Sequence, residues 1–396
     1  MDLTDNIEER TFRQLVRDFL DRNIPRGWGT RGYALPRGAD YAAIAADFQC
    51  RLSAAGLLCL SWPREYGGAG ASAAQVAIFN EEMSLRNAPQ LPNVAGVMLA
   101  GPIIYTYGSL EQKQRYLEPI RTCEETWCQG FSEPGAGSDL AALRTRAELR
   151  GDRFVVNGQK VWTSFAHYAD WCMLLARTDP AAARHRGLSL LLLDIKSRGV
   201  EVKPLRHITG AVEFNELFFN DVEVPRRNLV GEPNGGWQIA MSTLRNERGG
   251  TGIAAAARLQ LTFASLVALY RRLAARNPAV AADRGARGQL AHFYVQVQGL
   301  RHTVRRMLNG SQTSSADAAG SVVKVMWSEL NQRMQDFAIA LQGPAGQLLQ
   351  GSTHAPENGR WQFDFLRSRG NTIEMGTSEI HRNTITERGL RLPRSR

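Results

Sequence analysis

The chain has 396 residues, of which 43% are hydrophobic and 22% charged, and its formal net charge is +10 at pH 7. This length is enough for two or three domains, and the hydrophobic content is ordinary for a globular protein. The longest apolar runs, such as 171–176, are too short to span a bilayer, and the acidic start lacks the features of a secretion leader. We therefore expect a cytoplasmic protein without a membrane partner.

Arginine carries nearly all of the positive charge, because lysine occurs only at positions 113, 160, 196, 203 and 324. The arginines are scattered and form no run with interleaved aromatic residues, so nucleic-acid binding is not expected, although a basic, non-catalytic relative remains an alternative. Five cysteines without paired spacing fit a reducing compartment. Cys123 and Cys128 have no second Cys/His pair beside them, so no metal site is predicted.

Residues 1–122 are predicted to be mainly helical. Apolar residues at helical spacing predict helices over 42–55 and 74–85, separated by a proline- and glycine-rich loop at 62–68. Ser109 is the predicted N-cap of a further helix, with Gln112 as its capping-box partner.

Residues 123–230 have the pattern of a β domain. Asn157-Gly158 lies between two apolar arms over 154–162 and predicts a β-hairpin. Further strands are predicted over 188–194 and 215–224. Helical periodicity returns from Trp237, with a helix–helix turn near 275–288 and helices near 290–307, 320–341 and 378–388. The sequence therefore predicts an α+β fold with domains over 1–122, 123–230 and 231–396.

Six motifs occur in a fixed order along the chain. They are Trp-Pro-x-Glu-Tyr-Gly-Gly at 62–68, the segment 108–120, Ser-Glu-Pro-Gly-Ala-Gly-Ser-Asp at 132–139, Asn-Gly-x-Lys-x-Trp at 157–162, Val-x-Val-Pro at 222–225 and Gly-Thr-Ser-Glu-Ile at 376–380. Together they resemble the acyl-CoA dehydrogenase family over nearly the whole chain. The resemblance implies an N-terminal helical domain, a central β-barrel-like domain, a C-terminal four-helix bundle and bound FAD.

The resemblance also implies which residues contact the flavin. Trp162 would flank the isoalloxazine ring, with Ser164 near its N5 atom, and Thr377 and Glu379 would reach the adenosine half. Without its neighbouring motifs, Trp162 would be interpreted as an ordinary buried aromatic residue. The predicted FAD-binding set is Phe131, Ser132, Ser138, Trp162, Thr163, Ser164, Thr377 and Glu379.

The reaction requires a desolvated carboxylate that removes the α-proton of the thioester. Much of the family carries that glutamate immediately before the C-terminal Gly-Thr, where this chain has Met375. The neighbouring Glu374 would point in a different direction. A second branch places the base on the first long helix after the β domain, in a Leu-x-x-Glu-Arg pattern that matches 244–248, so Glu247 is the predicted base.

The same resemblance assigns the substrate contacts. Arg248 would hold the pantetheine or phosphate part of the thioester, and Ser138 would lie among the pyrophosphate or substrate contacts. Met375 would keep a backbone role, because its N–H can hold the thioester carbonyl whatever its side chain is. An ordinary surface Glu-Arg pair is the alternative interpretation of Glu247 and Arg248.

The chain departs from the family pattern near a subunit boundary. An Arg-x-x-Phe-Gly motif that touches the flavin pyrophosphate of a neighbouring subunit is missing from 275–288, and the glycine cluster is changed at 342–346. These departures resemble a bacterial subgroup that acts on bulky or polycyclic acyl thioesters, some of whose members are built from two unlike subunits. A homo- or heterotetramer or a dimer is therefore expected.

The predicted function is FAD-dependent α,β-dehydrogenation of an acyl-CoA to the 2-enoyl-CoA, with an electron-transfer flavoprotein as electron acceptor. An acyl-carrier-protein thioester is the alternative substrate. Two other functions stay open: a non-catalytic or partner-dependent subunit of a heteromeric acyl-CoA dehydrogenase, and a flavin monooxygenase or oxidase on the same fold. Retention of the Glu247-Arg248 pair favours the dehydrogenase over the oxidase.

Overall fold

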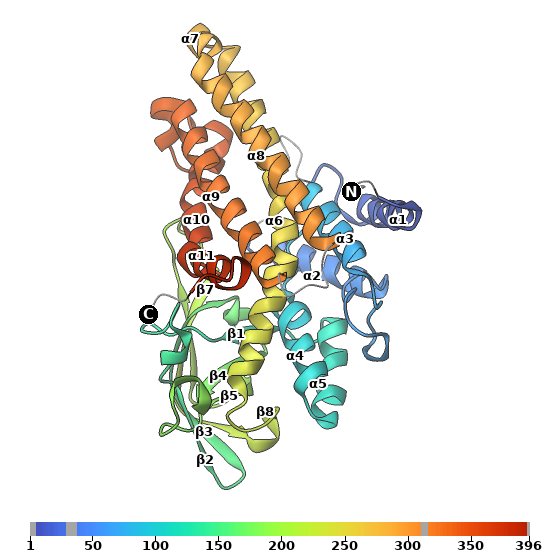
Figure 1. Ribbon diagram of the computed structural model, residues 1–396, viewed down its shortest axis with the longest axis vertical. Helices are drawn as coiled ribbons and strands as arrows, with labels where there is room; N and C mark the ends of the chain where they lie inside the picture. The colour runs from blue at the N-terminus through green and yellow to red at the C-terminus, as the bar shows by residue number, and fades with distance from the viewer. Residues whose placement is uncertain (1–4, 29–37, 310–315, 394–396) are drawn as a thin grey trace. The chain divides into compact units, whose positions relative to one another are not determined.

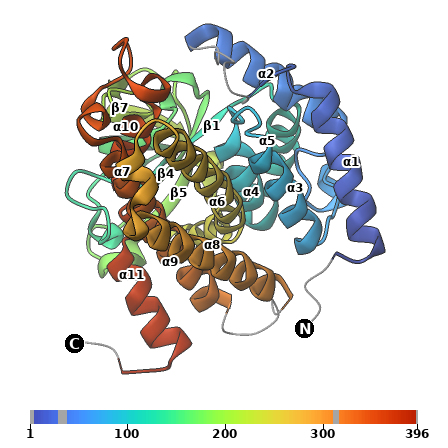
Figure 2. The ribbon, with the colours of Figure 1, turned by 90° about the horizontal axis from the view of Figure 1, so that it is seen from above.

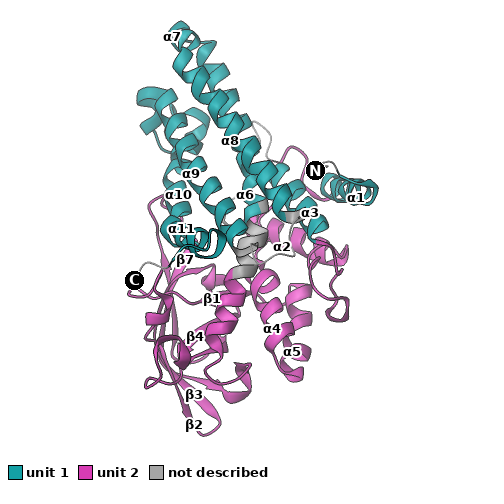
Figure 3. Cartoon of the chain, in the orientation of Figure 1, with its two compact units in different colours: residues 1–22, 73–88, 248–396 teal, residues 23–72, 89–247 magenta. Residues whose placement is uncertain are grey.

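The computed structural model describes residues 5–28, 38–309 and 316–393, without the side chains of 38, 39, 245–251, 253, 308, 309, 316 and 317. Contacts divide the chain into two compact units, coloured separately in Figure 3. Unit 1 comprises 1–22, 73–88 and 248–396, and unit 2 comprises 23–72 and 89–247. The predicted domain boundaries after residues 122 and 230 stay a prediction, since both units are assembled from segments distant in the sequence.

The described helices are α1 (Ile7–Asn23), α2 (Gly38–Ala54), α3 (Ala73–Leu85), α4 (Gly101–Tyr107), α5 (Leu110–Thr122), α6 (Gly236–Ala274), α7 (Pro278–Ala282), α8 (Arg284–Asn309), α9 (Ala316–Gln342), α10 (Arg360–Ser368) and α11 (Ser378–Thr384) (Figure 1). The helices predicted over 42–55, 74–85, 290–307 and 320–341 are confirmed as α2, α3, α8 and α9. The predicted capping box is also present, because Ser109 and Gln112 exchange side-chain to backbone hydrogen bonds of 3.2 and 3.1 Å.

The strands lie between α5 and α6 and form one sheet in unit 2. They are β1 (Trp127–Gly130), β2 (Arg146–Arg150), β3 (Arg153–Ser164), β4 (Trp171–Arg177), β5 (Leu188–Asp194), β6 (Val200–Leu205), β7 (Phe214–Pro225) and β8 (Leu229–Val230). Their order is β6-β7-β3-β2-β4-β5-β8, and β1 pairs in parallel with β4. Helices before and after a central sheet confirm the predicted α+β fold.

The predicted hairpin at Asn157-Gly158 is wrong. Residues 153–164 form the single strand β3, and the turn lies immediately before it at residues 151–152, where Gly151 has φ +62°. Asn157 and Gly158 instead form a bulge in the pairing with β7, where Asn157 donates to the Asp221 carboxylate at 2.9 Å and accepts from the Asp221 N–H at 3.0 Å. A Cβ at Gly158 would lie 2.6 Å from the Thr145 hydroxyl, so close strand packing explains this glycine.

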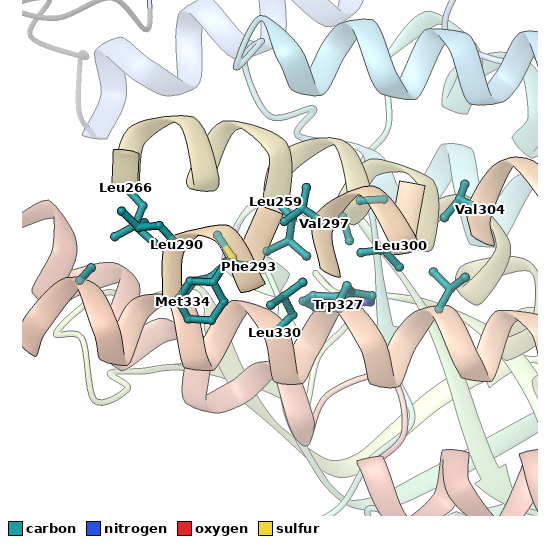
Figure 4. Packing of buried hydrophobic residues seen from close by; sticks show 14 of the residues in the cluster. Leu259, Leu266, Leu290, Phe293, Val297, Leu300, Val304, Trp327, Leu330 and Met334 are labelled. Carbon is teal, nitrogen blue, oxygen red and sulfur yellow. The ribbon is translucent and has the colours of Figure 1, made fainter. Parts of the chain in front are cut away.

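Unit 1 is organised around one apolar core shared by α6, α8, α9 and α10. Figures 1 and 2 both show α8 beside α9, and Figure 4 shows the core from close by. Burial of these side chains is the main stabilising term of such a bundle. Within the part of the chain that the structure describes, no helix is both long and apolar enough to cross a bilayer. The labelled core residues are Leu259, Leu266, Leu290, Phe293, Val297, Leu300, Val304, Trp327, Leu330 and Met334.

Lys324 on α9 is an exception to the apolar burial in unit 1. Its side chain is 4% exposed, and its Nζ has no hydrogen-bond partner among the described residues. Burial lowers the pKa of Lys324 from 10.5 to about 8, against the opposing effect of the carboxylates of Glu374, Glu329 and Glu379. A buried ammonium without a partner destabilises the folded state.

We expect Lys324→Met to stabilise the protein by about 1–2 kcal/mol at pH 7, because the substitution removes an unsatisfied ammonium and keeps much of the side-chain volume. The unfolded chain binds more protons than the folded one between pH 8 and 10.5, so this destabilisation should fade across that window. Denaturant unfolding of both proteins at pH 7 and pH 9.5 measures the effect. A loss of stability at pH 7 would show that the ammonium has a partner.

Candidate functional site

The loop that follows β1 carries three of the predicted flavin-binding residues. Phe131 is 5% exposed, Ser132 is half-buried and Ser138 is exposed. Glu133 and Ala136 close the loop through two backbone hydrogen bonds of 3.0 Å. The loop is therefore a compact turn with a buried aromatic residue at its start and an accessible hydroxyl near its end.

A buried ion pair holds this loop to β3. Lys160 is fully buried, and its Nζ donates to the Glu133 carboxylate and to the Phe131 carbonyl, both at 2.9 Å. The Glu133 carboxylate also accepts from the N–H groups of Arg144 at 2.7 Å and Thr145 at 2.8 Å. One carboxylate and one ammonium thus connect the end of β1, the start of β2 and the middle of β3.

Both members of the pair are charged at neutral pH. Burial raises the pKa of Glu133, but the Lys160 ammonium and the hydrogen bonds from Thr145 and Arg144 more than offset it, so the pKa lies below its usual value. Burial lowers the pKa of Lys160 to about 8, although Glu133 opposes this shift. A buried pair with these additional hydrogen bonds fixes geometry more than it adds net stability.

Trp162 follows the pair in an unusual backbone conformation. The pairing of β3 with β7 shifts between Lys160 and Thr163, and Trp162 within this bulge has φ +60°. The Val161 N–H donates to the Ser132 carbonyl at 2.9 Å, which joins the bulge to the loop. The Trp162 side chain is 54% exposed. A bulky residue with positive φ is a strained outlier, and such outliers concentrate at functional sites.

Aromatic and polar neighbours from β7 surround the bulge. Trp162 meets Phe214 edge-to-face with a centroid distance of 5.7 Å. Thr163 is fully buried, its carbonyl accepts from the Asn215 amide at 3.0 Å, and its Oγ1 has no partner among the described residues. Ser164 is exposed and pairs with Phe214 across the ladder. The predicted residues Phe131, Ser132, Ser138, Trp162, Thr163 and Ser164 therefore belong to one loop and one strand end in unit 2.

The predicted site residues Met375, Thr377 and Glu379 lie in unit 1. Met375 and Gly376 have φ values of +57° and +94°, so the chain turns sharply before α11. The Thr377 hydroxyl accepts from the Ile380 N–H at 3.2 Å and caps that helix. Glu379 is exposed, and hydrogen bonds from its own N–H and from Thr377 lower its pKa. Among the described residues, none accepts a hydrogen bond from the Met375 N–H.

The carboxylate of Glu374 is already engaged within unit 1. It pairs with the Arg367 guanidinium at 3.1 Å and accepts from the Asn371 amide at 2.8 Å. These partners agree with the expectation that Glu374 does not replace the glutamate that is missing at position 375. Glu247 and Arg248 belong to α6 by their backbone, and their side chains lie outside the described residues.

Two contacts at the candidate site were not predicted from the sequence. The Glu133–Lys160 pair could have been found, because Lys160 lies in phase with Phe154 and Val156 on the buried face of β3. A lysine at an inward position requires a buried partner. The contact of His381 with the Met375 carbonyl had no such signal, because it depends on the conformation of the turn.

The chain belongs to the acyl-CoA dehydrogenase family, whose members are flavoprotein oxidoreductases. Residues 6–124 match the N-terminal domain of that family, 128–222 the middle domain and 234–390 the C-terminal domain. The resemblance inferred from the six motifs is confirmed, and the chain is an acyl-CoA dehydrogenase.

Particular relatives are similar over their full lengths. Acyl-CoA dehydrogenase IpdE1 of Mycobacterium tuberculosis is 39% identical over 392 residues, which cover 98% of each chain. Among solved structures, the Tcur3481-Tcur3483 steroid ACAD matches with a TM-score of 0.85 at 30% identity over 100% of both chains. The ChsE4-ChsE5 complex from Mycobacterium tuberculosis matches with a TM-score of 0.83 at 29% identity, again over 100% of both chains.

We expect Lys160→Met to destabilise the protein by about 3–5 kcal/mol, because it leaves the Glu133 carboxylate buried without its cation. The loop at 131–133 should loosen, and flavin should be lost on gel filtration. Denaturant unfolding and the ratio of flavin to protein absorbance measure both effects. The double variant Lys160→Met/Glu133→Gln should recover part of the stability, since it removes the uncompensated charge. Equal stability of Lys160→Met and the wild type would contradict the structural role of the pair.

Proposed function

We propose that this chain uses FAD to dehydrogenate an acyl-CoA thioester between Cα and Cβ, and that Glu247 removes the α-proton. The observation that carries the flavin assignment is Trp162. Its backbone is strained, its side chain is 54% exposed, and the loop beside it is held by a buried ion pair. A flat heterocycle fits this indole and the accessible hydroxyls of Ser132, Ser138 and Ser164. Thr377 and Glu379 would contact the adenosine half.

When bound, FAD supplies the acceptor for the hydride that leaves Cβ. The chain supplies the rest of the chemistry. Glu247 would take the α-proton, and the Met375 N–H would donate to the thioester carbonyl, on which negative charge develops. Arg248 would hold the pantetheine or phosphate part of the substrate. The proposed product is the 2-enoyl thioester, and we propose an electron-transfer flavoprotein as the final electron acceptor.

Two similar structures support a proposal for the substrate class. One is the Tcur3481-Tcur3483 steroid ACAD, and the other is the ChsE4-ChsE5 complex of two different proteins. We therefore propose a polycyclic, steroid-derived acyl group for this chain and an unlike second subunit in its assembly. The changed segments at 275–288 and 342–346 support this proposal, because that is where the family places the flavin contact between subunits.

Glu247→Gln should lower the rate of thioester-dependent flavin reduction by about 10²–10⁴-fold, since an amide cannot accept the α-proton. Anaerobic stopped-flow measurements of flavin bleaching give this rate. Glu374→Gln is the matched control and should keep the rate within a few-fold, because Glu374 is engaged by Arg367 and Asn371. Near-normal bleaching by Glu247→Gln would rule out the proposed base. Rapid reoxidation by air without another acceptor would favour an oxidase.

A panel of thioesters tests the substrate class. Short, medium and long linear acyl-CoA compounds should bleach the flavin slowly, and a steroid-ring acyl-CoA should bleach it fast, because a pocket shaped for fused rings gives a linear chain few contacts. The readout is the apparent rate constant divided by the apparent dissociation constant for each compound. A preference for linear chains would reject the polycyclic substrate and leave the proposed base untouched.

A further inference from the structure

The turn at Met375 and Gly376 adopts a conformation that only its surroundings can maintain. Both residues have positive φ, +57° and +94°, and methionine rarely takes such a value. A Cβ at Gly376 would lie 3.0 Å from the Nε2 atom of His381, so glycine is required for close approach as well as for its backbone angle. The turn is therefore packed directly against the His381 imidazole.

His381 forms a hydrogen bond with the turn at the Met375 carbonyl. The ring is 1% exposed, and its Nε2 lies 3.0 Å from the Met375 carbonyl oxygen. Its Nδ1 lies 3.0 Å from the hydroxyl of Ser321 on α9, which is fully buried. A carbonyl oxygen only accepts, so Nε2 must carry the proton, and the Ser321 hydroxyl can donate to an unprotonated Nδ1. The contact with the Met375 carbonyl therefore requires a proton on Nε2, whichever atom donates between Nδ1 and the Ser321 hydroxyl.

The rest of the segment is fixed to α9 by other hydrogen bonds. Asn371 accepts from the Asn331 amide at 2.8 Å, and the Thr372 hydroxyl accepts from the Gln332 amide at 3.0 Å. Residues 371 and 372 thus lie beside 331 and 332, while His381 lies beside Ser321, so the segment runs antiparallel to α9. At the turn itself, the side-chain contact is the one from His381 to the Met375 carbonyl.

Holding the Met375 carbonyl also orients the amide group that follows. The described chain contains no cis peptide bond, so the Met375 C=O and the Gly376 N–H point in opposite directions across one rigid plane. The bond from His381 therefore keeps the Gly376 N–H on the side of the plane away from the imidazole. The Met375 N–H belongs to the preceding peptide plane, which is joined to this carbonyl through the φ and ψ angles of Met375, so the bond restrains its direction through the turn.

We propose that His381 is a positioning residue: its Nε2–H group holds the Met375 carbonyl and so fixes the turn whose Met375 N–H binds the thioester carbonyl. This inference rests on the proposed function. His381 does not touch the substrate. Ser321 acts one step further away, because its hydroxyl contacts Nδ1 on the other side of the ring.

Two isosteric substitutions separate positioning from simple packing. Glutamine places its amide nitrogen near the position of Nε2, whereas asparagine places its amide near Nδ1 and does not reach the carbonyl. His381→Gln should keep kcat within about 3-fold, and His381→Asn should lower kcat about 10- to 100-fold with little change in KM, as expected for a misplaced donor. Ser321→Ala should fall between the two.

The protonation of His381 can also be measured in the wild-type protein, and this measurement does not depend on catalytic turnover. Nitrogen-15 NMR of histidine-labelled protein, with the His381 signals identified by their loss in His381→Gln, should show a proton on Nε2. An unprotonated Nε2, or equal kcat values for His381→Gln and His381→Asn at matched thermal stability, would overturn the inference. If the wild type shows no thioester-dependent flavin bleaching, the proposed function fails, and the NMR result still decides how His381 holds the turn.

Discussion

The buried ion pair between Glu133 and Lys160 is the constraint on which the site in unit 2 depends. Burying two charges is costly, and their attraction repays the cost only when each also satisfies its other hydrogen-bonding capacity. Here the carboxylate accepts two backbone N–H groups and the ammonium reaches the Phe131 carbonyl. Because these contacts are directional, they define one relative position of three chain segments. An apolar pair of equal volume would fill the space without selecting that position.

Trp162 shows what this rigidity makes possible. A residue with positive φ and a large exposed aromatic surface is unfavourable in backbone conformation and in solvation. The fully buried Lys160 on one side and the Asn215 bond to Thr163 on the other hold the strand in place around the bulge. The strain is therefore local, and the pairing of β3 with β7 on both sides of the bulge determines the backbone geometry of Trp162. A ligand that covers the indole ring would remove its apolar surface from water and so offset this unfavourable solvation.

Much of the fold follows from local sequence, and the exceptions are instructive. The apolar run at 188–194 and the capping box at Ser109 are confirmed because neighbouring residues decide them. The hairpin prediction fails because Asn157 and Gly158 satisfy their preferences in another way: their partners, Asp221 and Thr145, come from other parts of the chain. Turn propensity describes the isolated segment, whereas the bulge is set by long-range strand pairing that local pattern does not reveal.

The turn at Met375 shows a difference between two catalytic roles: a side-chain base can be supplied from elsewhere in the chain, whereas a backbone N–H donor cannot. A carboxylate base needs only to reach the substrate's α-carbon, so a glutamate on another helix can serve, as we propose for Glu247. A backbone N–H has no flexible side chain, so it can donate to a carbonyl oxygen only where the local backbone conformation places it. A methionine without a backbone role would gain stability by leaving its left-handed conformation. His381 and Gly376 instead preserve that conformation, which is the arrangement expected where the amide group, and not the side chain, is the functional element.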